Sequence, residues 1–325
     1  MAAWCGHRGS SDRGRWVDPK PEIKPINLIR GGLVRPAIFT TLLAAAVLFG
    51  IFRSNDGAEN VALSSGSVQV SGSETMRPVV TACAADFMVR NPKADVIVKG
   101  GGSGDGIAAL LHGMVDVGMT SRALSRRERD YAISKGIEIA VFELARDGIA
   151  IVVNRANTST ALDVGQLQKI FSGKIRNWQE LDGGDAEIAA FARAEGSGTA
   201  ALFGERVLGQ ATYAASVQRL PDNEAIVAEI AKRSGAIGYA GIGALKGAGD
   251  RIKVLALRTD SHPSPIAPTS DTIRSGDYPL TRTLYLGTAG KPSGAAKAFL
   301  DFCSSASGHA LLERAGYVGI ARASP

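Results

Sequence analysis

Three short turns in this sequence combine glycines with hydroxyl side chains directly before a predicted helix. They are 72–75 (Gly-Ser-Glu-Thr), 100–104 (Gly-Gly-Gly-Ser-Gly) and 193–199 (Arg-Ala-Glu-Gly-Ser-Gly-Thr). Glycine lets the backbone approach a ligand closely, and the N–H groups at a helix N-terminus attract anions. One such turn is usually an ordinary helix cap, but three in one chain predict a site for a small oxyanion. Arg193 adds a planar, charged donor that suits a phosphate oxygen.

The charge of the chain is concentrated at its N-terminus. The 325 residues carry a net charge of +6, and residues 1–53 hold 8 basic and 3 acidic residues, or +5. The remaining 29 basic and 28 acidic residues leave only +1 for the rest. Binding to a nucleic-acid backbone requires a basic patch on the folded domain. We therefore expect no nucleic-acid partner.

An uncharged apolar run, Ala37–Phe52, follows this basic stretch. The distribution of charge predicts a cytoplasmic N-terminal segment, 1–35, and export of everything after the apolar run. Residues 36–53 are expected to form either an uncleaved signal-anchor helix or a cleaved signal peptide, the third reading being a buried core helix. Residues 54–65 are polar and small, which is typical of a linker. The predicted location is therefore periplasmic or extracytoplasmic, with an anchor in the inner membrane.

Downstream of residue 66, short apolar runs alternate with helical periodicity. The expected strands are 68–70, 94–98, 115–119, 137–144, 149–154, 187–192, 236–239, 253–257 and 283–287. The expected helices are 76–90, 107–111, 125–135, 164–170, 199–208, 223–233, 294–303 and 306–315. Such alternation is typical of mostly parallel sheets covered by helices. Because one sheet would be crowded by so many strands, we expect two α/β lobes with a cleft between them.

Several further motifs carry a family resemblance. They are Thr-Ser-Arg at 120–122, Arg-Asp-Gly-Ile-Ala at 146–150, the segments around Phe171 and Trp178, Gly-Ser-Gly-Thr at 196–199, Tyr-Pro-Leu-Thr-Arg at 278–282 and Gly-Tyr-Val at 316–318. In order and spacing they resemble the PstS-type phosphate-binding proteins of ABC transporters, over roughly residues 66–320. We expect Phe171 and Trp178 to serve packing rather than ligand binding.

This resemblance implies a two-lobed periplasmic-binding-protein fold of type II, preceded by the N-terminal apolar helix. The first lobe would hold 66–150 and 258–325, the second 151–257, and two crossing strands would form the hinge. Inorganic phosphate would bind between the lobes, which close on it. The partner would be an ABC permease of the inner membrane. The resemblance implies neither enzymatic activity nor a cofactor.

The resemblance also implies a set of phosphate ligands. They are Ser73, Glu74 and Thr75 in the first turn, Ser103 and Gly104 in the second, Ser121 after the third strand, and Arg193, Ser197, Gly198 and Thr199 from the second lobe. Glu74 would offer only its backbone, because a carboxylate would repel phosphate. Many members of the family have an aspartate directly after the serine, where this chain has Arg122. Asp147 is therefore the first candidate for the group that accepts the proton of hydrogen phosphate, and Asp105 is the second.

Two alternative functions remain open at this level. One is a tethered phosphate sensor or scaffold on the same fold, which the long N-terminal segment suggests. The other is a phosphatase, which would need a nucleophile with a base or a metal, and neither is evident in the sequence. The four histidines form no metal-ligand pattern. Cys83 and Cys303 are expected to be buried thiols, although a disulfide between them is compatible with export.

Overall fold

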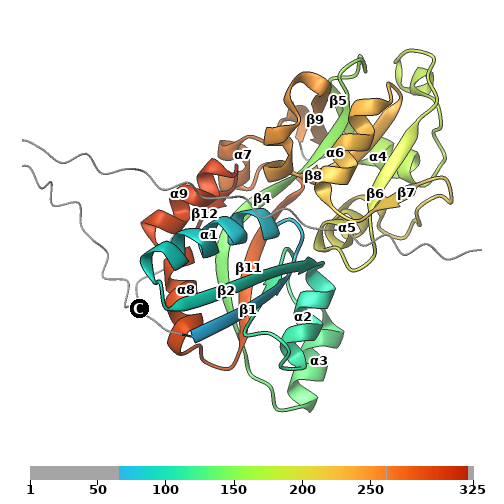
Figure 1. Cartoon of the computed structure of the whole chain (residues 1–325). Coiled ribbons are helices and arrows are strands. Elements are labelled where there is room, and N and C mark those ends of the chain that lie inside the picture. Colours follow the sequence, from blue (N-terminus) through green and yellow to red (C-terminus); the bar gives the residue numbers. More distant parts are fainter. Residues whose placement is uncertain (1–65, 261, 321–325) are drawn as a thin grey trace, which may run out of the picture. The chain divides into compact units, whose positions relative to one another are not determined.

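The structure, a computed structural model, describes residues 66–260 and 262–320. The expectations for 1–35, 36–53 and 54–65 fall outside these residues. The helices in the described part are all too short or too polar to cross a membrane. The fold is α/β, with helices packed against a mixed sheet of parallel and antiparallel strands whose two halves form two lobes (Figure 1).

The first lobe is built on three parallel strands in the order β2-β1-β3, followed by the antiparallel strand β11. Its strands are β1 (Gly66–Gly72), β2 (Ala94–Gly101), β3 (Val117–Thr120), β11 (Thr281–Ala289) and β12 (Val318–Gly319). Its helices are α1 (Arg77–Arg90), α2 (Ser103–Leu111), α3 (Arg126–Ser134), α8 (Gly294–Cys303) and α9 (Ala306–Arg314). The alternating residues Val68 and Val70 are fully buried, so β1 forms the centre of an apolar core with α1 and α8. Cys83 and Cys303 lie in that core as free thiols.

In the second lobe, strand β6 lies between β8 and β7 and pairs in parallel with both. Its strands are β5 (Ala161–Asp163), β6 (Ala189–Arg193), β7 (Gln218–Leu220), β8 (Ala236–Gly241), β9 (Ile252–Thr259) and β10 (His262–Ile266). Its helices are α4 (Val164–Phe171), α5 (Gly198–Phe203) with a π-helical continuation at Gly204–Leu208, α6 (Asn223–Lys232) and α7 (Ser270–Ser275). Short 3-10 turns lie at Trp178–Leu181, Ile242–Gly247 and Gly249–Arg251.

Aromatic side chains fill the core of the second lobe. Phe203 stacks on Tyr239 with 4.0 Å between ring centroids, and Phe171 meets Phe203 edge-on at 4.8 Å. The buried indole of Trp178 donates a hydrogen bond to the Gly235 carbonyl at 3.0 Å. The prediction that Phe171 and Trp178 serve packing is confirmed.

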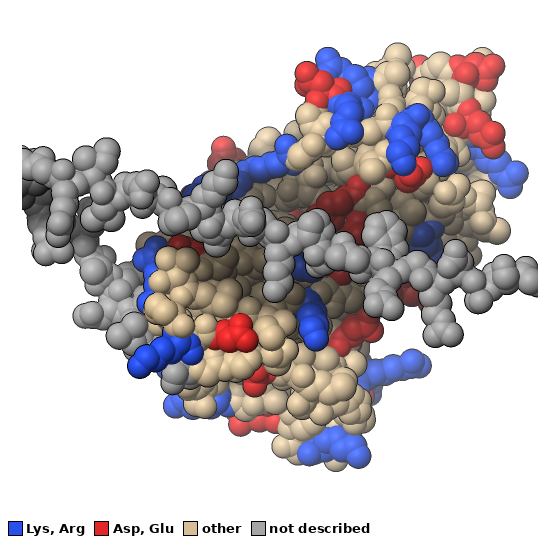
Figure 2. All heavy atoms as spheres, in the orientation of Figure 1, with Lys and Arg blue, Asp and Glu red and all other residues tan. Residues whose placement is uncertain are grey.

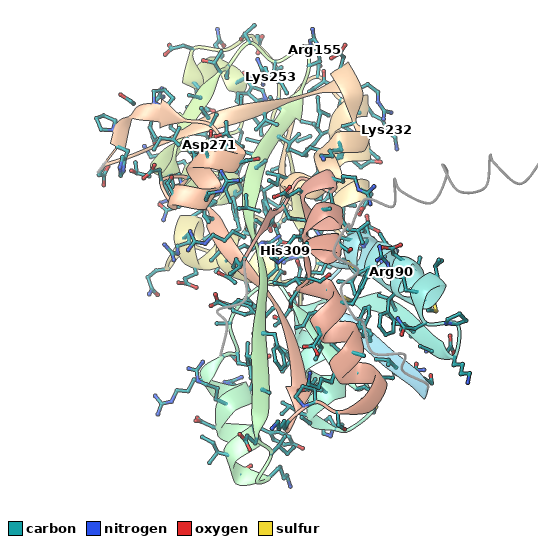
Figure 3. The ribbon with its side chains drawn as sticks, turned by 90° about the vertical axis from the view of Figure 1, so that its left-hand side faces the viewer. Arg90, Arg155, Lys232, Lys253, Asp271 and His309 are labelled. Carbon is teal, nitrogen blue, oxygen red and sulfur yellow. The ribbon has the colours of Figure 1, made fainter. Side chains whose placement is uncertain are left out.

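Strand β4 (Ile139–Asn154) connects the two lobes. Its first part pairs with β11, from Ile139 to Gly148, and its second part pairs with β8 and β9. In Figure 3 it is the long pale-green ribbon, and Arg155, which directly follows it, is labelled at its upper end.

The sequence predicted two strands here, 137–144 and 149–154, with residues 145–148 (Ala-Arg-Asp-Gly) between them. That prediction was wrong: residues 145–148 pair with β11 and continue the strand. The resemblance also implied a second crossing strand. The chain instead returns from β9 to β11 through β10 and α7.

Candidate anion-binding site

Four hydroxyl side chains from the two lobes meet at the ends of these strands. Thr75 Oγ1 lies 3.2 Å from Thr199 Oγ1, and Ser103 Oγ lies 3.1 Å from Ser121 Oγ. The Ser121 N–H also donates to Ser103 Oγ at 3.0 Å. All four side chains are buried. Each hydroxyl carries one donor and two lone pairs, so each is able to turn toward a shared ligand.

Gly198 lies between the two hydroxyl pairs. A Cβ built on Gly198 would lie 2.5 Å from the Oγ atoms of both Ser103 and Ser121, and Thr199 is the next residue. The second and third turns also touch through their backbones, since the Gly104 N–H donates to the Gly196 carbonyl at 3.1 Å. The structure therefore brings the three turns to one place.

Arg193, at the end of β6, is a buried cation beside this cluster, with 1% of its surface exposed. Its guanidinium donates to Asn223 Oδ1 at 2.6 Å and to the Pro221 carbonyl at 2.8 Å, while Asn223 Nδ2 donates to Thr75 Oγ1 at 3.2 Å. Among the described residues, the Nε of Arg193 has no hydrogen-bond partner, and the Arg193 guanidinium forms no salt bridge with a carboxylate. Burial, and then repulsion from Arg282, lower the pKa of Arg193. A buried cation of this kind favours an anion nearby.

Arg282 on β11 is a site residue that the sequence analysis missed. Its Nη1 donates to Thr199 Oγ1 at 2.8 Å, and its Nη2 donates to Thr75 Oγ1 at 3.2 Å. Its Nε and Nη2 also donate to Asp147 Oδ2, at 2.8 and 2.6 Å. The one available signal was its place at the end of the 278–282 motif, which was used for the resemblance but not for the site.

Asp147 lies in the middle of β4 with no exposed surface. Both contacts with Arg282 use Oδ2, and Oδ1 has no hydrogen-bond partner in the part of the chain that the structure describes. Burial raises the pKa of this carboxyl, and the positive charge of Arg282 opposes the rise. Asp105, the second candidate for the acceptor, is exposed in the first turn of α2.

Ser73, Glu74 and Ser197 have local roles in the structure. The Ser73 carbonyl accepts the Met76 and Arg77 N–H groups at the start of α1, both at 3.0 Å. The Glu74 carboxylate accepts the Gly101 N–H at 2.8 Å and Arg77 Nε at 2.6 Å, so it is not a ligand for an anion in this position. Ser197 caps α5, accepting the N–H groups of Thr199 and Ala200 at 3.2 and 3.3 Å.

A cavity of about 730 Å³ borders the hydroxyl cluster, and we call it the lobe-junction cavity. It is lined by residues 121–125, 201–202, 205–206, 281–283 and 285, which include Ser121 and Arg282 of the cluster. Arg122, also in its wall, holds Glu128 with two hydrogen bonds of 2.8 and 2.7 Å. Basic and acidic side chains are interspersed over the face shown in Figure 2.

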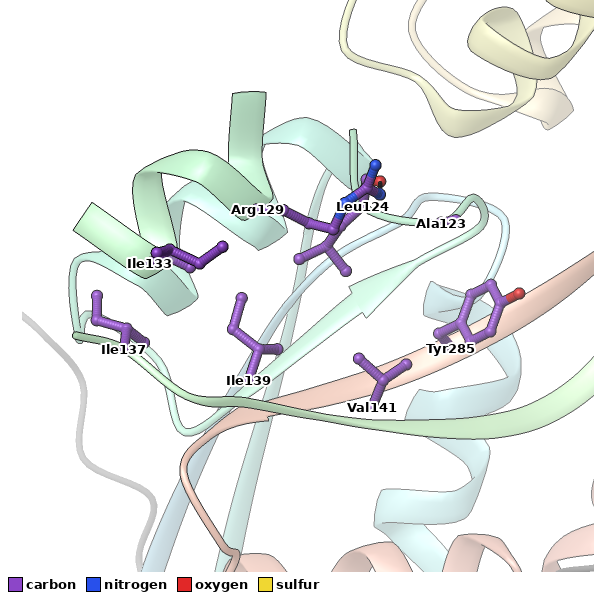
Figure 4. A pocket seen from close by; sticks show the side chains of 9 residues that line it. Ala123, Leu124, Arg129, Ile133, Ile137, Ile139, Val141 and Tyr285 are labelled. Carbon is purple, nitrogen blue, oxygen red and sulfur yellow. Dashed lines mark hydrogen bonds between the residues drawn. The ribbon is translucent and has the colours of Figure 1, made fainter. Parts of the chain in front are cut away.

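An apolar groove of about 380 Å³ lies beside this cavity and shares three of its residues (Figure 4). It is lined by Ala123, Leu124, Arg129, Ala132, Ile133, Ile137, Ile139, Val141 and Tyr285. Arg129 is its only basic lining residue, and the Arg129 Nη1 donates to the Leu124 carbonyl. The groove is therefore a poor site for a small anion compared with the hydroxyl cluster.

The chain is similar to known proteins over most of its length. A family model described as a PBP superfamily domain matches residues 57–307. The phosphate-binding protein PstS of Bacillus subtilis (strain 168) is 34% identical over 255 residues, covering 78% of this chain and 80% of the relative. PstS of Staphylococcus saprophyticus is 30% identical over 266 residues, covering 81% and 82%.

Solved structures of phosphate transport proteins have a similar fold. A putative phosphate ABC transporter substrate-binding protein from Clostridium perfringens, solved with bound phosphate, matches with a TM-score of 0.70 and 26% identity, over 78% of this chain and all of that one. An ABC-type phosphate transport receptor from Vibrio cholerae matches with a TM-score of 0.63 and 29% identity, over 77% and 99%. The chain therefore belongs to the PstS-type phosphate-binding proteins of the PBP superfamily.

Proposed function

We propose that this chain binds inorganic phosphate between its two lobes, as the extracytoplasmic solute-binding component of an ABC-type phosphate importer. The observation that carries the proposal is the buried guanidinium of Arg193, which has no carboxylate partner among the described residues and is joined through Asn223 to the hydroxyl cluster. The names of the relatives, and the phosphate bound in the Clostridium structure, support the choice of anion. These relatives are named as binding proteins, not as enzymes.

The hydroxyls of Thr75, Ser103, Ser121 and Thr199 would turn from one another to the phosphate oxygens. Arg193 would supply a charge-assisted hydrogen bond. The N–H groups of Glu74 and Gly198 would add donors. Those of Ser73, Gly104 and Ser197 donate to the carbonyls of Met119, Gly196 and Ala194, so these residues would help mainly by shaping the turns. The two lobes would separate to admit the anion and close on it.

Asp147 would accept the proton of hydrogen phosphate. Its Oδ1 is a buried carboxylate oxygen without a partner among the described residues, and sulfate has no proton to offer it. Arg122 cannot take this role, because it is a cation engaged with Glu128. An Asp147→Asn variant should therefore lose part of its preference for phosphate over sulfate.

The partner would be an ABC permease of the inner membrane, with the chain held at the membrane through residues 37–52. Phosphate uptake by cells that produce a form without residues 1–53 tests this tether. Full uptake by a secreted form would show that the tether is dispensable, whereas uptake that requires residues 1–53 would support it.

Calorimetric titration of the full chain with phosphate, arsenate and sulfate tests the proposal itself. We expect binding of phosphate and arsenate, and much weaker binding of sulfate. Absence of heat with millimolar phosphate would refute the function. The Arg193→Lys variant should bind more weakly, while Arg233→Lys, at an exposed arginine paired with Glu229, serves as the matched control.

A further inference from the structure

Arg282 touches both of the threonines through which the lobes meet. The Thr75 hydroxyl comes from the first lobe and the Thr199 hydroxyl from the second, and each lies within 3.2 Å of an Arg282 nitrogen. We propose that Arg282 is a second anion-binding guanidinium, held in position by Asp147. This inference rests on the proposed function and adds a residue to its site.

The geometry of the Asp147 contact leaves part of Arg282 available. Asp147 uses a single oxygen, Oδ2, for both Nε and Nη2. The guanidinium is planar with its donors in a rigid fork, so this contact fixes the direction of Nη1. Nη1 points at Thr199 Oγ1 from 2.8 Å. An anion that replaces the contact between Thr75 and Thr199 would therefore lie within reach of Nη1 and Nη2.

The surroundings hold the pair in place. A Cβ built on Gly241 would lie 3.0 Å from Thr75 Cγ2, 3.1 Å from Asp147 Oδ2 and 3.2 Å from Arg282 Nη2. The three side chains thus pack against the same piece of backbone. The side chain of Arg282 is 2% exposed and that of Asp147 is fully buried, so water does not screen either charge effectively.

A simpler role for Arg282 is to neutralise Asp147 and nothing more. A buried carboxylate requires a partner, and one arginine satisfies it. The charges distinguish the two roles. Arg193 and Arg282 against Asp147 leave one positive charge in the cluster, and if Asp147 becomes asparagine there are two. If Arg282 contacts the anion, it still contributes to anion affinity in the asparagine variant. If Arg282 is only a counter-ion for Asp147, it contributes nothing to anion affinity there.

The experiment compares two variants in which Asp147 is already neutral. They are Asp147→Asn and the double variant Asp147→Asn with Arg282→Gln, titrated with phosphate and with sulfate after thermal melts verify that both fold. Because neither variant contains an unpaired Asp147, the comparison isolates the guanidinium. Arg274→Gln, at an exposed arginine on α7, is the control and should leave binding unchanged.

We expect the double variant to bind sulfate and phosphate about 30-fold more weakly than Asp147→Asn, the loss of a hydrogen bond to a charged ligand. Equal affinities within threefold would overturn the proposal and leave Arg282 as a counter-ion. A folded Asp147→Asn variant that binds neither anion would overturn it as well. Absence of phosphate binding by the unaltered chain would instead refute the proposed function, and the role of Arg282 with it.

Discussion

A methyl group at position 198 should abolish tight phosphate binding while leaving the chain folded. In Gly198→Ala the new Cβ would lie 2.5 Å from the Oγ atoms of Ser103 and Ser121, and real Cβ contacts are essentially never shorter than 3.0 Å. Gly198 is not among the glycines with positive φ, so alanine adds no backbone strain. Both serine side chains must rotate away or the lobes must separate. Either response removes hydroxyls from the proposed ligand.

The magnitude follows from the two hydroxyls. A hydrogen bond to a charged group contributes about 1.5–3 kcal/mol, so losing two costs at least about 3 kcal/mol, or roughly 100-fold in the dissociation constant. Calorimetric titration with phosphate measures this loss. Gly204→Ala, also beside α5, is the control, because a Cβ there meets nothing within 4 Å. Phosphate affinity of Gly198→Ala within threefold of the unaltered chain would refute the argument that the hydroxyls bind the anion.

Three other predictions concern the cation, the Arg122 pair and the aromatic core. Arg193→Lys should weaken phosphate binding about 10- to 100-fold, because an ammonium cannot reproduce the fork that bonds Asn223 and the ligand together; unchanged calorimetric affinity would contradict this. Burial would raise the pKa of Glu128, but hydrogen bonds from Arg122 and Ser125 outweigh it and lower the pKa. Glu128→Gln should therefore destabilise the chain by up to about 1 kcal/mol at neutral pH. In melting scans, that difference in stability should shrink as the pH falls below 4.5, the ordinary pKa of glutamate, and should vanish below the lowered pKa of Glu128 in the folded chain. A difference that stays constant with pH would exclude the mechanism. Phe171→Ala should cost about 3–5 kcal/mol, a fall of about 10 °C in melting temperature, yet leave phosphate affinity unchanged at temperatures where the variant is folded; a large loss of affinity would mean that Phe171 does more than pack.

The alternation of strands and helices predicted the fold because the apolar periodicity is local. The burial of Val68 and Val70 and the Ser125 cap of α3 follow directly from their neighbours in sequence. The continuity of β4 does not. Residues 145–148 are extended because β11 pairs with them from more than 130 positions later, and a local pattern contains no information on such a partner.

The site divides in the same way. The hydroxyls at 75, 103 and 199 lie in glycine-containing turns and were recognised from those turns. Arg282 and Asn223 lie in no such turn, and they reach the cluster only because strand β11 and helix α6 begin beside it. Glu74 shows the reverse, since it lies in the right turn but its carboxylate is engaged by Arg77 and the Gly101 N–H.

Phosphate binding between the lobes requires that one anion replaces the contact between the Thr75 and Thr199 hydroxyls. A crystal structure of the chain grown with arsenate, which scatters anomalously and resembles phosphate in shape and charge, tests it most directly. We expect one strong anomalous peak within hydrogen-bonding distance of the hydroxyls of Thr75 and Thr199 and of the Arg193 guanidinium. A peak elsewhere, with Thr75 still bonded to Thr199, would contradict it.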